Sequence, residues 1–131
     1  MIVYFDWYNT ILWKNKNHSI SDVFCLSIQI LQYEFLGPIR LSEWGPPMEK
    51  VVYLIMSRKK DRFGIIYVDD CEKTEKTDFF IQNDRFKCWL QNGGREEDLY
   101  LAILPMFEAE DYQRKRIVER IISGYKPICN Q

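Results

Sequence analysis

Residues 51–68 read VVYLIMSRKKDRFGIIYV, and they give the clearest indication of the fold. Two runs rich in β-branched and aromatic residues, 51–55 and 63–68, flank a charged segment at 58–62. Such a pair of runs predicts an antiparallel β-hairpin with a long basic tip.

The chain after the hairpin supplies the other elements of a small domain. Residues 69–78 are acidic and polar and predict a loop, and 79–91 predict a short aromatic helix or an irregular segment. Residues 99–104 predict a third strand, and 108–123 predict a helix with acids in its first turn and Gly124 as its C-cap. The predicted fold is α+β, a small antiparallel three-stranded sheet flanked by helices.

The N-terminal third of the chain predicts an extension, 1–44, on a domain that spans 45–131. Its apolar start, 1–13, favours a strand that runs into a turn. The apolar spacing over 21–36 predicts a helix, which Gly37 ends. We expect the extension to pack on the domain and to be a candidate surface for a second copy or another protein partner.

Composition limits the classes of function. The 131 residues are 47% hydrophobic, enough for a single domain with its own core. The net charge of −1 does not favour nucleic-acid binding in bulk, so any basic surface must be local. The four cysteines, without a Cys-x-x-Cys pair, predict free buried thiols and no zinc site.

The chain carries no apolar run of about 18 residues, so no membrane span is expected. Its start lacks the basic and long apolar regions of a signal peptide. These features and the cysteine usage predict a cytoplasmic protein in a reducing compartment.

The order hairpin, helix, strand, helix and tail resembles the GIY-YIG endonuclease superfamily over residues 45–131. The ending Tyr125-Lys126-Pro127-Ile128-Cys129-Asn130 is similar to the Tyr-x-Pro-x-x-Asn tail of that family. Val51-Val52-Tyr53 stands where the family has Gly-Ile-Tyr, and Tyr67-Val68-Asp69 stands where it has Tyr-Ile-Gly.

The resemblance implies phosphodiester hydrolysis of DNA with Mg²⁺ or Mn²⁺ as the metal. It also implies that Tyr53, Tyr67 and Arg85 surround the scissile phosphate, and that a glutamate on the last helix holds the metal. The basic residues suited to phosphate contact are those of the hairpin tip and the last helix: Arg58, Lys59, Lys60, Arg62, Arg114 and Lys115.

The expected metal ligand is the main departure from the family pattern. Val118 occupies the position seven residues before the tail tyrosine, where the family has its glutamate. Glu119 is the nearest carboxylate, but it lies about 100° further around a helix. The sequence therefore predicts a nuclease-like fold with weakened or lost hydrolysis, or a binding module for DNA or protein on the same fold.

A second resemblance points to a different hydrolase. Residues 2–10 are similar to the nucleophile strand of haloacid-dehalogenase-like hydrolases, with Asp6 as the nucleophile. In this interpretation Asp69 and Asp70 end a strand and supply carboxylates for Mg²⁺. The chain lacks the alternating strand–helix units of a doubly wound sheet, which argues against it.

Overall fold

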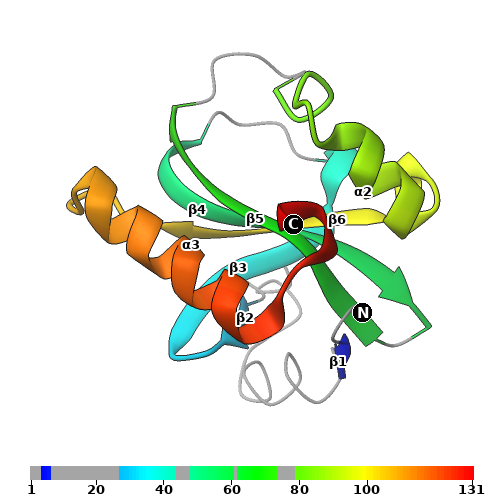
Figure 1. Cartoon of the computed structure of the whole chain (residues 1–131), viewed down its shortest axis with the longest axis horizontal. Helices are drawn as coiled ribbons and strands as arrows, with labels where there is room; N and C mark the ends of the chain where they lie inside the picture. The colour runs from blue at the N-terminus through cyan, green and yellow to red at the C-terminus, as the bar shows by residue number, and fades with distance from the viewer. Residues whose placement is uncertain (1–3, 7–26, 44–47, 61, 74–78) are drawn as a thin grey trace, which may run out of the picture.

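The computed structural model of the chain describes residues 4–6, 27–43, 48–60, 62–73 and 79–131. These residues form one antiparallel sheet with a helix on each face, and α3 and α2 lie on opposite sides of the strands (Figure 1). Six strands follow the order β1-β5-β4-β6-β3-β2: β1 (Tyr4–Asp6), β2 (Ser27–Ile30), β3 (Tyr33–Arg40), β4 (Glu49–Lys59), β5 (Arg62–Lys73) and β6 (Leu99–Pro105). The helices are α2 (Phe86–Gly93) and α3 (Asp111–Tyr125), and short 3-10 turns are η2 (Leu41–Glu43), η3 (Glu96–Asp98) and η4 (Ile128–Asn130). The α+β class is confirmed.

The hairpin of β4 and β5 is longer than its apolar runs indicate. Lys59 pairs with Arg62, so the segment predicted as a charged turn is mostly strand. At the other end, Asp69 pairs with Tyr53, and β5 continues to Lys73 through residues predicted as a loop. Asp69 and Asp70 remain in the strand because β4 supplies a pairing partner for each of them, Tyr53 and Val52 respectively.

Alternation along β4 builds two hydrophobic layers. Val52, Leu54 and Met56 face α3, whereas Val51, Tyr53 and Ile55 face α2. Both sets are nearly fully buried because helices cover both faces of the central strands. The α3 layer is completed by Ile117, Val118 and Ile121, and the α2 layer by Phe80, Trp89 and Cys129.

The helix predicted over 21–36 is wrong wherever the structure describes that segment. Residues 27–30 belong to β2 and 33–36 to β3, with a turn at 31–32, and 21–26 lie outside the described residues. Ile28 and Ile30 are buried whereas Gln29 is exposed, which is the period of a strand. The apolar spacing that predicted a helix also fits the alternation of a strand in part. Pairing of β3 with β6 favours the strand over the helix.

Within the described residues, the sheet consequently has six strands where the sequence predicted three. Because β3 pairs with β6 and β2 pairs with β3, both strands belong to the same sheet as the predicted 45–131 domain. Of the strand predicted over 1–13, the structure describes Tyr4–Asp6, which forms β1 against β5.

The ends of α3 also differ from the prediction over 108–123. Glu110 is the N-cap, and its backbone N–H donates a hydrogen bond of 2.7 Å to the side chain of Gln113. This reciprocal capping box starts the helix at Asp111. The helix runs through Gly124 and ends at Tyr125, and the C-cap is Lys126, which adopts a left-handed conformation with φ of 49°. Among the described residues, no helix combines the length and apolarity needed to cross a membrane.

The C-terminal tail is fastened to the domain in two places. The side-chain amide of Asn130 donates to the Val68 carbonyl at 2.8 Å and accepts from the Val68 N–H at 2.9 Å, so it acts as a strand partner for β5. Next to it, Cys129 forms a disulfide with Cys88 of α2. The expectation of free thiols is therefore wrong for these two cysteines. Cys71 is free and buried, and Cys25 lies outside the described residues.

Candidate functional site

Tyr53 and Tyr67 come together on the α2 face of the sheet. They belong to the adjacent strands β4 and β5, and their ring centroids lie 6.3 Å apart. The rings pack against Phe80 and Trp89, at centroid distances of 5.3 Å from Tyr53 and 5.2 Å from Tyr67 respectively. Only 1% of Tyr53 and 7% of Tyr67 is exposed, so both rings are largely part of the core.

The hydroxyl of Tyr67 donates a hydrogen bond of 2.9 Å to Asp69. Burial, followed by the negative charge of Asp69, raises the pKa of Tyr67 well above its ordinary value. The pKa of Tyr53 is also raised, first by burial and then by the neighbouring Tyr67. Near neutral pH both hydroxyls therefore stay protonated, and neither is suited to take a proton from water.

Arg85 approaches this pair from the start of α2. It is the N-cap residue of that helix and is exposed. Its positive charge acts on Tyr67 in the direction that lowers the pKa of the phenol, against the larger effect of burial. The structure therefore brings Tyr53, Tyr67 and Arg85 to one region of the α2 face.

The expected metal ligand lies elsewhere. Val118 is buried in the layer between α3 and the sheet, whereas Tyr53 and Tyr67 belong to the layer on the other face. Glu119 is the next residue of α3 and is exposed. The sheet thus separates Glu119 from the tyrosines, and the described residues contain no group of three acidic, Cys or His side chains suited to a metal ion. The donor set around the tyrosines does not fit the divalent metal that the resemblance implies.

Asp69 and Asp70 do not form a carboxylate pair, because they serve opposite faces of β5. Asp69 accepts the hydrogen bond from Tyr67 on the α2 face, and Asp70 accepts one from Arg114 of α3 at 3.2 Å. Asp6 belongs to β1 and pairs with Arg62, at the opposite end of β5. At about 3.3 Å per residue, Asp6 and Asp69 are roughly 23 Å apart, so they cannot act on one substrate as the dehalogenase-like interpretation requires.

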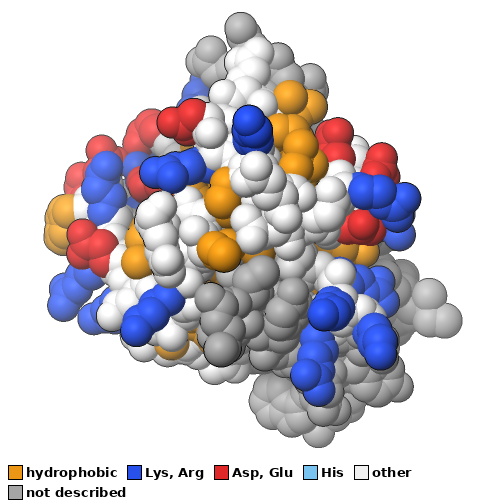
Figure 2. All heavy atoms as spheres, turned by 45° about the vertical axis from the view of Figure 1, so that its right-hand side comes forward, with side chains coloured by type: hydrophobic (Ala, Val, Ile, Leu, Met, Phe, Trp, Pro, Cys, Tyr) orange, Lys and Arg blue, Asp and Glu red, His pale blue; other side chains and the backbone are white. Residues whose placement is uncertain are grey.

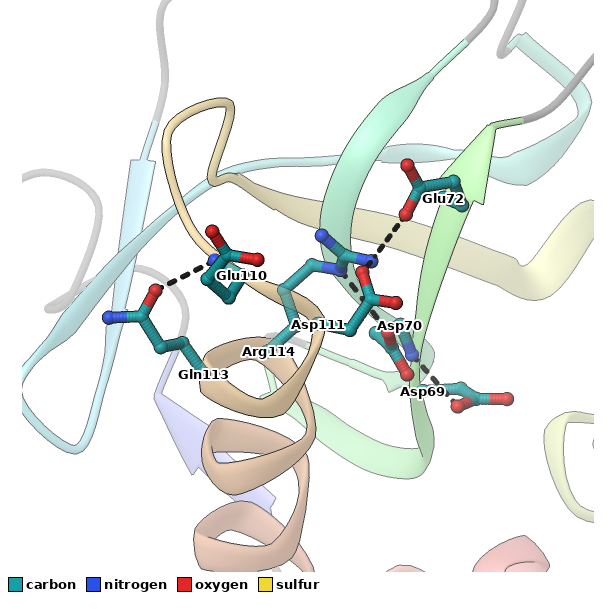
Figure 3. A network of polar contacts seen from close by, with 7 residues as sticks. All are labelled: Asp69, Asp70, Glu72, Glu110, Asp111, Gln113 and Arg114. Atoms are coloured by element: carbon teal, nitrogen blue, oxygen red, sulfur yellow. Dashed lines mark hydrogen bonds and ion pairs between the residues drawn. The ribbon is translucent and has the colours of Figure 1, made fainter.

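Arg114 is a structural cation. Only 2% of its side chain is exposed, and it also binds Glu72 at 2.8 Å and Asp111 at 2.6 Å. Figure 3 shows the three carboxylates directed at the guanidinium from β5 and α3, while Asp69 points away. These hydrogen bonds tie the first turn of α3 to the end of β5 and leave the guanidinium unavailable to a phosphate.

The basic tip, defined as Arg58, Lys59, Lys60 and Arg62, projects from the opposite end of the hairpin. All four side chains are exposed. Nε of Arg58 donates to the Lys60 carbonyl at 2.8 Å, and its guanidinium lies 5.9 Å from the Phe63 ring centroid. Figure 2 shows Lys and Arg side chains gathered at the lower right, on the side where Figure 1 places the end of this hairpin.

Lys115 is exposed on α3, but it does not extend the basic tip. Its neighbour Arg114 contacts Asp70 of β5. Asp70 and Arg62 are eight residues apart along β5, which corresponds to about 26 Å between the two positions. The two basic stretches of the sequence therefore form separate surfaces.

Three features of this region were not found from the sequence. The Tyr67–Asp69 hydrogen bond depends on a residue predicted to lie in a loop. The Cys88–Cys129 disulfide joins residues 41 positions apart, a spacing that carries no sequence signal. The Asn130 bonds to Val68 belong to the tail motif, whose spacing alone does not show what its amide contacts.

The comparisons with known proteins do not assign this chain. No family model matches it, and neither a curated protein nor a solved structure does. The proposed function therefore rests on the residues and the structure of this chain.

Proposed function

We propose that this chain is a divergent GIY-YIG-like domain that binds nucleic acid through its basic tip, with weakened or lost metal-dependent hydrolysis. The order β5-β4-β6 and the succession of hairpin, α2, β6, α3 and tail support the family proposal. Residues 27–40 add two strands to the edge of that arrangement.

The observation that carries the proposal is the basic tip. Four exposed Lys and Arg side chains occur within five residues, at the end of a hairpin whose strands are held in ten register pairs. Lys and Arg on a rigid projecting element suit phosphate contacts, which position a protein on nucleic acid without reading its sequence. Because the total charge of the chain is close to zero, the positive charge at the basic tip is the principal electrostatic attraction that the described surface offers to a polyanion.

The interior of the domain argues for binding without turnover. Replacing a carboxylate ligand by Val118 removes the charge that a hard divalent cation needs. Tyr53 is enclosed by aromatic rings, and Tyr67 is held by Asp69, so both side chains have clear packing roles. The family arrangement is thus retained as a scaffold, and the tip supplies the binding surface.

Fluorescence anisotropy with a short labelled DNA duplex, at several salt concentrations, tests the proposal. If all four tip charges neutralise phosphates, log Kobs falls against log salt concentration with a slope near −3.6, at about 0.9 per phosphate. Replacing the four tip residues with glutamine should abolish binding at low salt. The matched control replaces Lys115 and Arg116 of α3, which are exposed but distant from the tip, and should change affinity little.

Equal losses in the tip and α3 variants would refute the tip as the binding surface. Absence of salt-dependent binding in the wild type would refute the nucleic-acid partner and favour a protein partner for the same domain.

A further inference from the structure

The Cys88–Cys129 disulfide differs in accessibility at its two ends. Cys129 is 1% exposed and packs in the α2 layer, whereas Cys88 is half-buried on α2. The Cys88 end of the disulfide is therefore the more accessible to a thiol from solvent. Accessibility is one of the factors that decide which sulfur of a disulfide is attacked.

The position of Cys88 in the helix favours a thiolate at its sulfur. Cys88 is the third residue of α2, in the first turn, where unpaired N–H groups concentrate positive potential, and two basic residues, Arg85 and Lys87, lie within three positions of it in the chain. The side-chain amide nitrogen of Asn92 lies 3.5 Å from the sulfur of Cys88 and 3.7 Å from that of Cys129. Asn92 can therefore donate to whichever sulfur becomes charged.

We propose that Cys88 and Cys129 form a reversible redox pair that fastens the C-terminal tail to α2. A small-molecule thiolate attacks the Cys88 sulfur, the Cys88–Cys129 bond breaks, and Cys129 leaves as a thiolate that takes up a proton. A second thiol attacks the reagent's sulfur in the mixed disulfide and releases Cys88. The protein gains two electrons and two protons, and two thiol molecules become one disulfide.

Reduction changes how the tail is held. Asn130 follows Cys129 directly, and its amide makes both hydrogen bonds to Val68 of β5. Once the covalent bond is cut, these hydrogen bonds and the burial of Pro127 and Cys129 are left to hold the end of the chain. The Val68 N–H then opens to solvent more often, next to Tyr67. This proposal does not depend on nucleic-acid binding.

The test equilibrates the folded full-length chain in a series of reduced and oxidised glutathione mixtures. Samples are acid-quenched, alkylated and mapped by mass spectrometry. Cys88 and Cys129 should convert together and reversibly, with glutathione trapped on Cys88. A Cys129→Ser variant should accumulate the mixed disulfide at Cys88, while Cys71→Ser should leave the exchange unchanged. A disulfide that reacts only after unfolding, or glutathione trapped on Cys129, would overturn the proposal.

Hydrogen exchange on wild-type protein, with and without dithiothreitol, tests the fastening without relying on a variant. Exchange of the Val68 amide should accelerate by roughly tenfold or more on reduction, while that of Leu54 in the central strand β4 stays the same. Unchanged exchange at Val68 would show that the disulfide does not fasten the tail.

Discussion

Replacing Arg114 with methionine removes the guanidinium that three carboxylates share. Asp70 is only 13% exposed and would be left near the core without its partner, whereas Glu72 and Asp111 are 62% and 72% exposed and can rehydrate. Leaving one partner of a buried ion pair without the other lowers the free energy of unfolding by about 3–5 kcal/mol. Because Asp70 is partly exposed, we expect a loss of about 3 kcal/mol for Arg114→Met. At roughly 2.1 cal/mol/K per residue, the melting temperature of this 131-residue chain should fall by about 11 °C.

Urea unfolding followed by circular dichroism measures this change, with Arg116→Met as the matched control. Arg116 is exposed on the same helix, so its replacement should change the unfolding free energy by less than about 0.5 kcal/mol. Adding Asp70→Asn to Arg114→Met should recover part of the loss, because no carboxylate is then stranded.

The pH dependence separates the ion pairs from packing. Hydrogen bonding to Arg114 holds the pKa of Asp111 below its usual range. This pairing therefore stabilises the fold above the pKa of an unfolded carboxyl and is lost as pH falls through the folded pKa. The Arg114→Met variant should lose that part of the acid dependence. Wild-type stability in this variant, or loss of DNA binding without loss of stability, would refute the structural role of Arg114.

Three further predictions concern the tail, the core and alkaline pH. Asn130→Ala removes both hydrogen bonds to Val68 and should lower the unfolding free energy by about 1–3 kcal/mol in urea titrations; an unchanged midpoint would contradict the strand-like role of the amide. Val118→Glu places a carboxylate in the α3 layer, so it should destabilise the chain and restore no Mg²⁺-dependent cutting of plasmid DNA, whereas a stable, active variant would show that this position reaches a metal site. Burial, followed by the Asp70 charge, raises the pKa of Cys71 to about 11, so the folded state holds this proton more tightly and stability should fall from pH 9 to about pH 11; Cys71→Ala should show a shallower decline.

The elements predicted correctly from the sequence carry strong local signals. The hairpin, β6 and α3 combine uninterrupted apolar periodicity with turn or capping residues. The missed strand β3 depends on pairing with β6, at least 60 residues later, and β2 in turn pairs with β3. The apolar spacing of both strands also fits a helix. Non-local pairing overrides local propensity there.

The candidate site shows the same division between local and non-local information. Tyr53 and Tyr67 could be placed together because both lie on the predicted hairpin, and the exposure of the basic tip follows from its charge. Arg114 was predicted to contact phosphate because its partners, Asp70 and Glu72, were expected in a loop. Their position on β5 becomes apparent only when the register of the hairpin is known.

Binding and cleavage of DNA, measured on the same sample, test whether the chain binds nucleic acid through its basic tip without hydrolysing it. Wild-type protein is titrated onto labelled duplex, single-stranded and branched DNA in Mg²⁺ or Mn²⁺, and each mixture is then resolved on a denaturing gel. We expect salt-sensitive binding that requires Arg58, Lys59, Lys60 and Arg62, with the DNA strands left intact. Metal-dependent cleavage that Tyr67→Phe or Arg85→Ala abolishes would contradict this expectation, because the tyrosine region would then be a working active site.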